Sequence, residues 1–230
     1  MREYTLEKFQ TKLDRNISFR KRELTILKTQ IEASSGYTLN TFIRTGVVFL
    51  YAHWEGFIKE ASKEFFRYLN AKTIERKNLK NNYIVTSLKY VIMDCGKSKK
   101  SQKHSELFNE VMLNDDLPFR IDVDKAEAPI IDTESNLKSV VFDEILYVLG
   151  LDKDDFELKY TLLDESLLSN RNKIAHGENI SFLRNETKEF EMQAKEDYEK
   201  LYQTILELMD LFKDKLLECV KDELYLKETC

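Results

Sequence analysis

The chain has 230 residues, enough to bury the core of one large domain, and it leaves little room for a second full domain. Glycine and proline contribute only 6 and 2 residues, so long helices are favoured. The formal net charge of -5 argues against a protein whose whole surface binds nucleic acid, although a local basic patch remains open.

The cysteines and the apolar stretches indicate the cellular compartment in which the chain works. The three cysteines include no Cys-x-x-Cys pair, so they indicate neither a disulfide framework nor a zinc site and are typical of reduced thiols. The N-terminus lacks the apolar core of a signal peptide. The longest apolar stretch, Gly46 to Trp54, has nine residues, whereas a membrane span needs roughly 20. We therefore expect a cytoplasmic protein with no membrane partner.

Two long helices are predicted at the start of the chain. Over residues 6–31, apolar side chains recur at steps of three, four or seven, which marks one face of a helix, and the Ser-Ser-Gly sequence at 34–36 ends it. Over residues 38–69 they cover more than one face. That pattern is typical of the central helix of a bundle.

The regular pattern weakens between about residues 71 and 133, where both prolines, a basic run and an acidic run lie. We interpret this segment as a less regular insertion with one or two short helices. Further helices are predicted over 140–149, stopped by Gly150, over 161–175, and from about 185 or 187 to 221. The chain is thus predicted to be a single all-α domain over residues 1–230, an antiparallel helical bundle with a middle insertion.

The segment from Ser169 to Gly177, S-N-R-N-K-I-A-H-G, places polar and cationic groups at the end of an apolar helix. At about 100° per residue, Asn172 and His176 share the face opposite Ile174. Arg171 lies on the flank, from where it can turn either inward or toward His176. We expect Ile174, with Leu163, Leu167 and Asn170, to face the bundle core. An outward polar face is what a composite site across a dimer axis requires.

This segment resembles the signature of the HEPN superfamily, in which an Arg is followed by a polar residue and, after four to six positions, by a His. The resemblance implies a HEPN-type helical bundle and metal-independent cleavage of RNA, in which a 2′-hydroxyl attacks its own phosphodiester. His176 is then the general acid or base. Arg171 holds the scissile phosphate. Asn172 orients the imidazole or donates a further hydrogen bond.

A second segment, Phe49 to Phe57, resembles the second helix of the RiboL-PSP branch of HEPN proteins, which includes presumed ribonuclease toxins. Its Glu55 lies at the margin of the apolar stripe, where an unpaired carboxylate is costly. In the functional interpretation Glu55 lies beside Arg171. His53 projects to a different side, so we treat His53 and Trp54 as packing or interface residues.

Plainer interpretations of both segments stay open at this point. Arg171 and His176 also suit the carbonyl end of any helix, where cations are favoured. Glu55 also suits an ordinary ion pair. In one HEPN branch a Tyr stands two positions after the motif His, but here that position is Glu178, so modification of a Tyr there is not available.

A basic patch lies in the middle segment, at Lys97, Lys99 and Lys100. Together with Lys173 of the motif it could track an RNA backbone, although a solvated loop explains the patch equally well. The three histidines are too scattered for a metal site, and no cofactor is expected.

The resulting hypothesis is a homodimeric endoribonuclease without metal or cofactor. The family likeness adds a role as a toxin or antiphage defence effector, with RNA as substrate and an antitoxin or defence-system protein as partner. The alternative is a catalytically inactive HEPN-like helical module that uses the same face for interaction or scaffolding.

Overall fold

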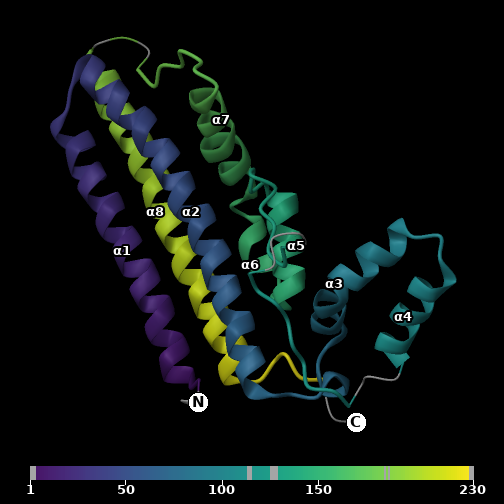
Figure 1. Ribbon diagram of the computed structural model, residues 1–230. Coiled ribbons are helices and arrows are strands. Elements are labelled where there is room, and N and C mark those ends of the chain that lie inside the picture. The colour runs from purple at the N-terminus through teal and green to yellow at the C-terminus, as the bar shows by residue number, and fades with distance from the viewer. Residues whose placement is uncertain (1–3, 113–115, 125–128, 184, 186, 228–230) are drawn as a thin grey trace.

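The computed structural model describes residues 4–112, 116–124, 129–183, 185 and 187–227. Within these ranges the regular elements are helices, and β-structure is limited to two isolated bridges. Three long helices, α1 (Leu6–Ala33), α2 (Gly36–Lys72) and α8 (Lys188–Lys221), lie side by side. Helix α1 runs antiparallel to the other two, as Figure 1 shows. The predicted all-α bundle is confirmed.

Helix α2 lies at the centre of the bundle because apolar side chains cover it on several faces. It contacts α1, α8 and the later helices, and its buried residues include Leu50, Trp54 and Phe57, each at most 1% exposed. Full burial of such large side chains contributes roughly 1.5–3 kcal/mol each before the entropy of ordering is subtracted. The broad apolar coverage read from the sequence therefore reflects a helix that is surrounded by others.

Two short helices attach to this core through aromatic rings. They are α5 (Ser139–Leu149), which ends at Gly150 with a φ of 68°, and α6 (Asp154–Glu157). Phe142 of α5 lies 5.2 Å from Trp54 of α2 and 5.2 Å from Phe156 of α6, measured between ring centroids. These edge contacts anchor the chain just before the helix that carries the motif.

The segment predicted as a helix over 161–175 departs from regular α geometry. Residues Leu162–Ser169 form a π-helix, η2, and only Asn170–Ala175 form the α-helix α7. A π turn holds more residues than an α turn, so the regular period fails here. Leu163, Leu167 and also Leu168 are buried, whereas Asn170 and Ile174 are only half-buried. Ile174 nevertheless packs against the core, as expected, and Leu168 widens the predicted stripe.

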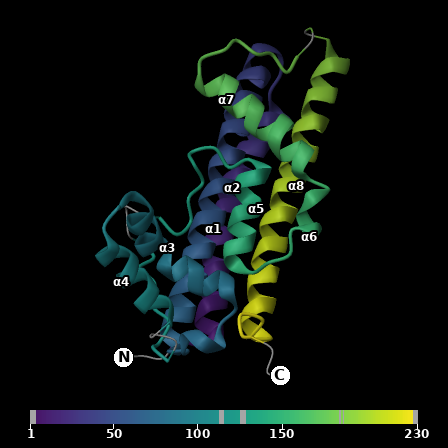
Figure 2. The same ribbon diagram turned by 90° about the vertical axis from the view of Figure 1, so that its right-hand side faces the viewer.

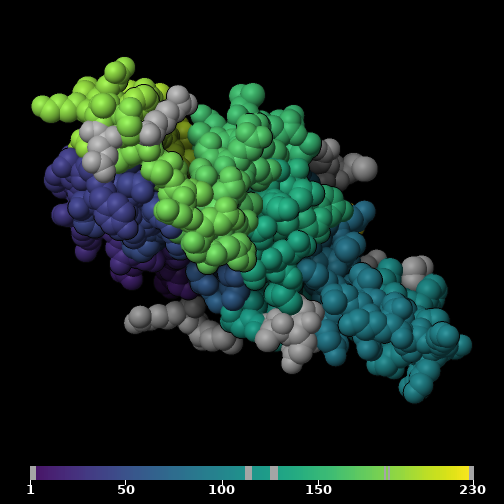
Figure 3. All heavy atoms as spheres, turned by 90° about the horizontal axis from the view of Figure 1, so that it is seen from above, coloured from purple at the N-terminus to yellow at the C-terminus, as the bar shows by residue number. Residues whose placement is uncertain are grey.

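The middle of the chain forms a helical hairpin from α3 (Asn81–Lys97) and α4 (Ser101–Met112). It stands away from the long helices in both ribbon views, and Figure 3 shows it projecting from the body of the molecule. A single-turn 3-10 helix, η1 (Arg76–Asn78), precedes it. At its base the Tyr83 hydroxyl donates to the Leu149 carbonyl over 2.6 Å.

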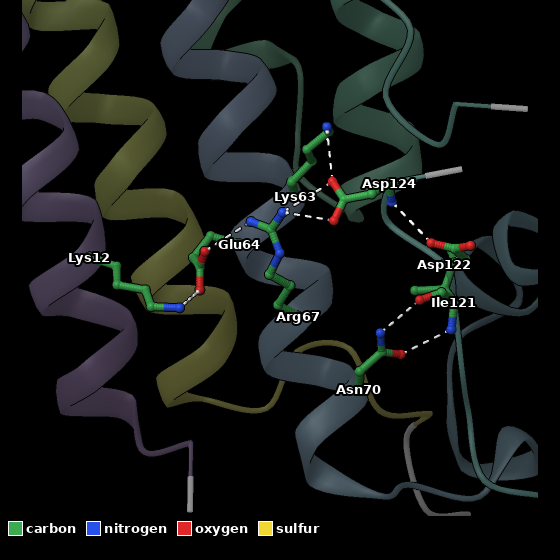
Figure 4. A network of polar contacts seen from close by, with 8 residues as sticks. All are labelled: Lys12, Lys63, Glu64, Arg67, Asn70, Ile121, Asp122 and Asp124. Atoms are coloured by element: carbon green, nitrogen blue, oxygen red, sulfur yellow. Dashed lines mark hydrogen bonds and ion pairs between the residues drawn. The ribbon is translucent and has the colours of Figure 1, made fainter. Parts of the chain in front are cut away.

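After the hairpin the chain returns along α2, and we call residues 116–124 and 129–138 the connecting segment. Figure 4 shows how its first part is attached: Asn70 exchanges two hydrogen bonds with the Ile121 backbone, of 2.8 and 3.0 Å, and Arg67 reaches Asp124 at 3.2 Å. The second part approaches α2 near its middle, at Tyr51 and Glu55. This path brings a loop from the middle of the chain to the motif helix.

Within the described residues, no helix combines the length and apolar character that crossing a bilayer requires.

Candidate functional site

The motif helix α7 is short, and its end is closed by backbone hydrogen bonds. The amide of His176 donates to the Asn172 carbonyl over 2.9 Å, and the amide of Glu178 donates to the Lys173 carbonyl over 2.9 Å. Gly177 allows this closure because its φ is 79°, in the left-handed region that glycine adopts without strain. The helix thus ends at Gly177, as predicted, through a left-handed glycine and the two backbone hydrogen bonds that close its last turn.

Arg171 turns inward and lies against Tyr51 of α2. Its guanidinium carbon is 4.4 Å from the centroid of the Tyr51 ring, a cation–π contact, and its Nη1 donates to Asn172 Oδ1 over 2.8 Å. Such a contact contributes about 0.5–2 kcal/mol, with the larger values where water is excluded. The residue as a whole is half-buried. Of the two directions left open for Arg171, the structure takes the inward one.

Asn172 stands between Arg171 and the connecting segment. While its Oδ1 accepts from Arg171, its Nδ2 donates to Asn136 Oδ1 over 3.1 Å. Its side chain is half-buried, although the helical period predicted an outward orientation. The difference arises because the connecting segment covers this side of α7. Asn172 contacts Arg171 rather than the imidazole of His176.

Tyr51 is the buried platform of this group. The side chain is 2% exposed, and its hydroxyl accepts a hydrogen bond of 2.8 Å from the Leu137 amide. Burial raises the pKa of Tyr51 to about 12, and the nearby Glu55 carboxylate raises it further, against the opposing effects of the Leu137 amide and Arg171. The ring is therefore neutral at physiological pH.

Glu55 lies one turn beyond Tyr51 on α2 and accepts a hydrogen bond from the Thr133 hydroxyl. The Lys59 ammonium is 4.0 Å away, and the Glu55 side chain is 17% exposed. Across the described residues no ion pair joins Glu55 to Arg171. The Glu55 carboxylate and the Arg171 guanidinium each influence the pKa of the Tyr51 phenol from their own side. The structure thus places Glu55 next to Tyr51 and not in an ion pair with Arg171.

His176 is exposed at the last turn of α7. The five-residue step from Arg171 corresponds to a rise of about 7.5 Å along an α-helix. Among the hydrogen bonds and ion pairs of the described chain, none involves the His176 imidazole. One copy of the chain therefore brings Arg171 and Asn172 together and leaves His176 at the surface.

The other residues of the α2 segment pack inside the bundle. Trp54 is 1% exposed and His53 is 5% exposed. His53 packs on Phe49, with ring centroids 4.3 Å apart, and its Nδ1 lies 3.5 Å from the Arg20 guanidinium of α1. Burial and the charge of Arg20 lower the pKa of His53, against the raising effect of Glu23. His53 thus belongs to the α1–α2 contact and not to the motif.

The predicted RNA-binding lysines lie in two places. Lys97, Lys99 and Lys100 are exposed where α3 passes into α4, on the hairpin that both ribbon views show apart from α7. Lys173 is exposed on α7 itself. The structure does not bring the hairpin lysines to Arg171 within one copy of the chain.

Sequence reasoning missed three residues that contact the predicted site residues. Tyr51 contacts Arg171, Thr133 contacts Glu55, and Asn136 contacts Asn172. Tyr51 was detectable, because it precedes Glu55 by four positions and so shares its helix face. Thr133 and Asn136 lie in an irregular segment, where no helical periodicity predicts which way a side chain points. Their role follows only from the path of the connecting segment.

The RiboL-PSP-HEPN family model aligns with residues 15–218, which include both the α2 segment and the motif. Searches of curated proteins and of solved structures found no match.

Proposed function

The chain belongs to the RiboL-PSP-HEPN family, and from this premise we propose that it is a metal-independent endoribonuclease that cleaves RNA by 2′-hydroxyl transesterification. The observation that carries the proposal is the position of the Arg171 guanidinium. Tyr51 of α2 and the neighbouring Asn172 hold it on the short helix α7, which ends at the exposed imidazole of His176. A fixed cation and a free general acid–base are the two groups that this reaction needs.

In the proposed reaction Arg171 binds the scissile phosphate. A guanidinium has five donors, and among the described residues Asn172 accepts from Nη1 alone, so the other donors can bind phosphate oxygens. The 2′-oxygen attacks phosphorus as an imidazole takes its proton. The bond to the 5′-oxygen breaks, and an imidazolium returns a proton to that oxygen. The products are a 2′,3′-cyclic phosphate and a 5′-hydroxyl.

We further propose that the complete site needs two copies of the chain. Within the described residues no hydrogen bond joins His176 to Arg171, and His176 lies on the surface, where a second copy related by a two-fold axis can meet it. The imidazole of one copy then lies beside the Arg171 guanidinium of the other and acts first as base and then as acid. Lys173, exposed on the same helix, and Lys97, Lys99 and Lys100 on the hairpin would bind the RNA backbone.

The biological role that fits such an activity is a toxin or antiphage defence effector acting on cytoplasmic RNA, restrained by an antitoxin or another defence-system protein. Family membership supports this role. Expression of the wild-type chain should slow growth, and His176→Ala should remove the effect.

The direct test is incubation of the purified chain with total RNA and tRNA in excess EDTA. Arg171→Ala and His176→Ala should abolish cleavage, while Arg22→Ala and His104→Ala, which change exposed residues of α1 and α4, serve as matched controls. Fragments should carry cyclic phosphate ends. Intact RNA with a folded dimer would instead support the inactive interaction module.

Mixing the two inactive variants tests the composite site. Heterodimers of Arg171→Ala and His176→Ala contain one intact Arg171 and one intact His176 on different copies. If the two groups act across the interface, mixing should restore a substantial part of the activity. No recovery, with subunit exchange verified, would mean that the two groups act within one copy.

A further inference from the structure

The last residues of the connecting segment form a tight turn beside α7. Glu134 and Ser135 both have positive φ, 51° and 57°, and the Asn136 amide donates to the Thr133 carbonyl over 2.8 Å. These are the features of a type I′ turn, whose two central positions favour glycine and asparagine. Glu and Ser at these positions are strained, so the surrounding contacts must hold the turn in place.

The first and last residues of the turn, Thr133 and Asn136, contact side chains of the candidate site. Thr133, 1% exposed, donates to Glu55, and Asn136 accepts from Asn172. The next residue, Leu137, donates its amide to the Tyr51 hydroxyl. The turn and Leu137 after it therefore contact Glu55, the hydroxyl of Tyr51 and Asn172, which neighbours Arg171.

The donor and the acceptor in each of the two hydrogen bonds from Arg171 to Asn136 follow from the chemistry of the guanidinium. A guanidinium only donates, so Asn172 must turn its Oδ1 toward Arg171. Its Nδ2 then faces Asn136, which must present an acceptor. Asn136 thus accepts from Asn172 Nδ2 and holds the Asn172 amide with its Oδ1 toward Arg171 Nη1.

We propose that Asn136 is a positioning residue of the ribonuclease site, which fixes the Arg171 guanidinium on Tyr51 through the amide of Asn172. This inference rests on the proposed function for its catalytic consequence. An arginine side chain loses considerable rotamer entropy when it is fixed. Fixing it before RNA binds removes that cost from the catalytic step.

The kinetic test compares Asn136→Ala with Asn136→Asp. Alanine removes the acceptor, and kcat should fall about tenfold while KM stays within about twofold, because Arg171 is present but misplaced. Aspartate keeps an acceptor for Asn172 Nδ2 and should restore most of the activity. Asn109→Ala, at an exposed position of α4, is the matched control. An Asn136→Asp variant as impaired as Asn136→Ala, with the same thermal unfolding midpoint, would overturn the proposal.

A second measurement does not depend on cleavage. The Arg171 Nε–H resonance, assigned by its absence in Arg171→Lys, should be shifted upfield by the Tyr51 ring in NMR spectra. It should move toward the value of a free arginine in Asn136→Ala and stay in place in Asn136→Asp. An unchanged resonance in Asn136→Ala overturns the positioning role. The expected shifts in a chain that cleaves no RNA would leave positioning intact and overturn the nuclease.

Discussion

At the scale of single residues, Tyr51 has two separable roles. Its ring faces the Arg171 guanidinium, and its hydroxyl accepts a hydrogen bond from the Leu137 amide of the connecting segment. The first role concerns the site, and the second concerns the attachment of the connecting segment to α2. Both are performed by a side chain that is almost completely buried.

These two roles predict different outcomes for two substitutions. Tyr51→Phe keeps the ring but leaves the Leu137 amide without its acceptor, which should lower the free energy of unfolding by about 1–3 kcal/mol with cleavage retained. Tyr51→Leu also removes the ring, and kcat should fall about tenfold. Denaturant titration and cleavage rates distinguish the two effects. Tyr147→Phe, at an exposed tyrosine of α5, is the control; full activity in Tyr51→Leu would contradict the role of the ring.

At the scale of elements, the strained turn over 133–136 offers a test of its geometry. Ser135 has a φ of 57°, and an L-residue in the left-handed region costs about 1–2 kcal/mol relative to its preferred conformation. Ser135→Gly should raise the free energy of unfolding by roughly 0.5–1 kcal/mol, since glycine avoids this strain but has more freedom in the unfolded chain. Ser135→Ala should give no such gain. Equal stability of the two variants would contradict a strained turn.

The motif helix is the element whose details periodicity could not predict. A regular α-helix was predicted over 161–175, and its end at Gly177 agrees with the structure. The π-helix over Leu162–Ser169 changes the rotation of everything that follows it. The direction of Arg171 depends on this local change.

At the scale of the whole molecule, many tyrosines are buried. Burial raises the pKa of Tyr51 to about 12 and raises the pKa of five others above the usual value near 10; these are Tyr4, Tyr83, Tyr160, Tyr198 and Tyr225. They come from the N-terminus, α3, the residues just before η2, α8 and the C-terminus. Ionisation of these phenols is therefore linked to the stability of the entire bundle.

This linkage predicts a loss of stability in alkali. Above pH 10 the unfolded chain releases phenolic protons that the folded chain retains, so the free energy of unfolding falls as the pH rises toward 12 and beyond. Below about pH 9 the contribution is fully present. Phenolate absorbance at 295 nm and helical circular dichroism, followed together, should change in one transition. Titration of these tyrosines near pH 10 with the helices intact would contradict the prediction.

The sequence by itself determined the class and the main helices. Apolar spacing and scarce helix breakers predicted the long helices now seen as α1, α2 and α8, and Gly150 and Gly177 end helices where expected, because helix formation and termination depend on local residues. The resemblance of the two segments to HEPN proteins is confirmed by the family match over residues 15–218. The catalytic roles of Arg171, Asn172, His176 and Glu55 remain predictions.

Only the tertiary structure decided how the candidate site is assembled. Arg171 lies on Tyr51, Glu55 is bound by Thr133, and Asn172 is held by Asn136. These contacts join residues 36 to 120 positions apart, and they depend on the π-helix and on the path of the connecting segment. Neither feature leaves a periodic signal, because each is fixed by packing against α2 rather than by local backbone preference.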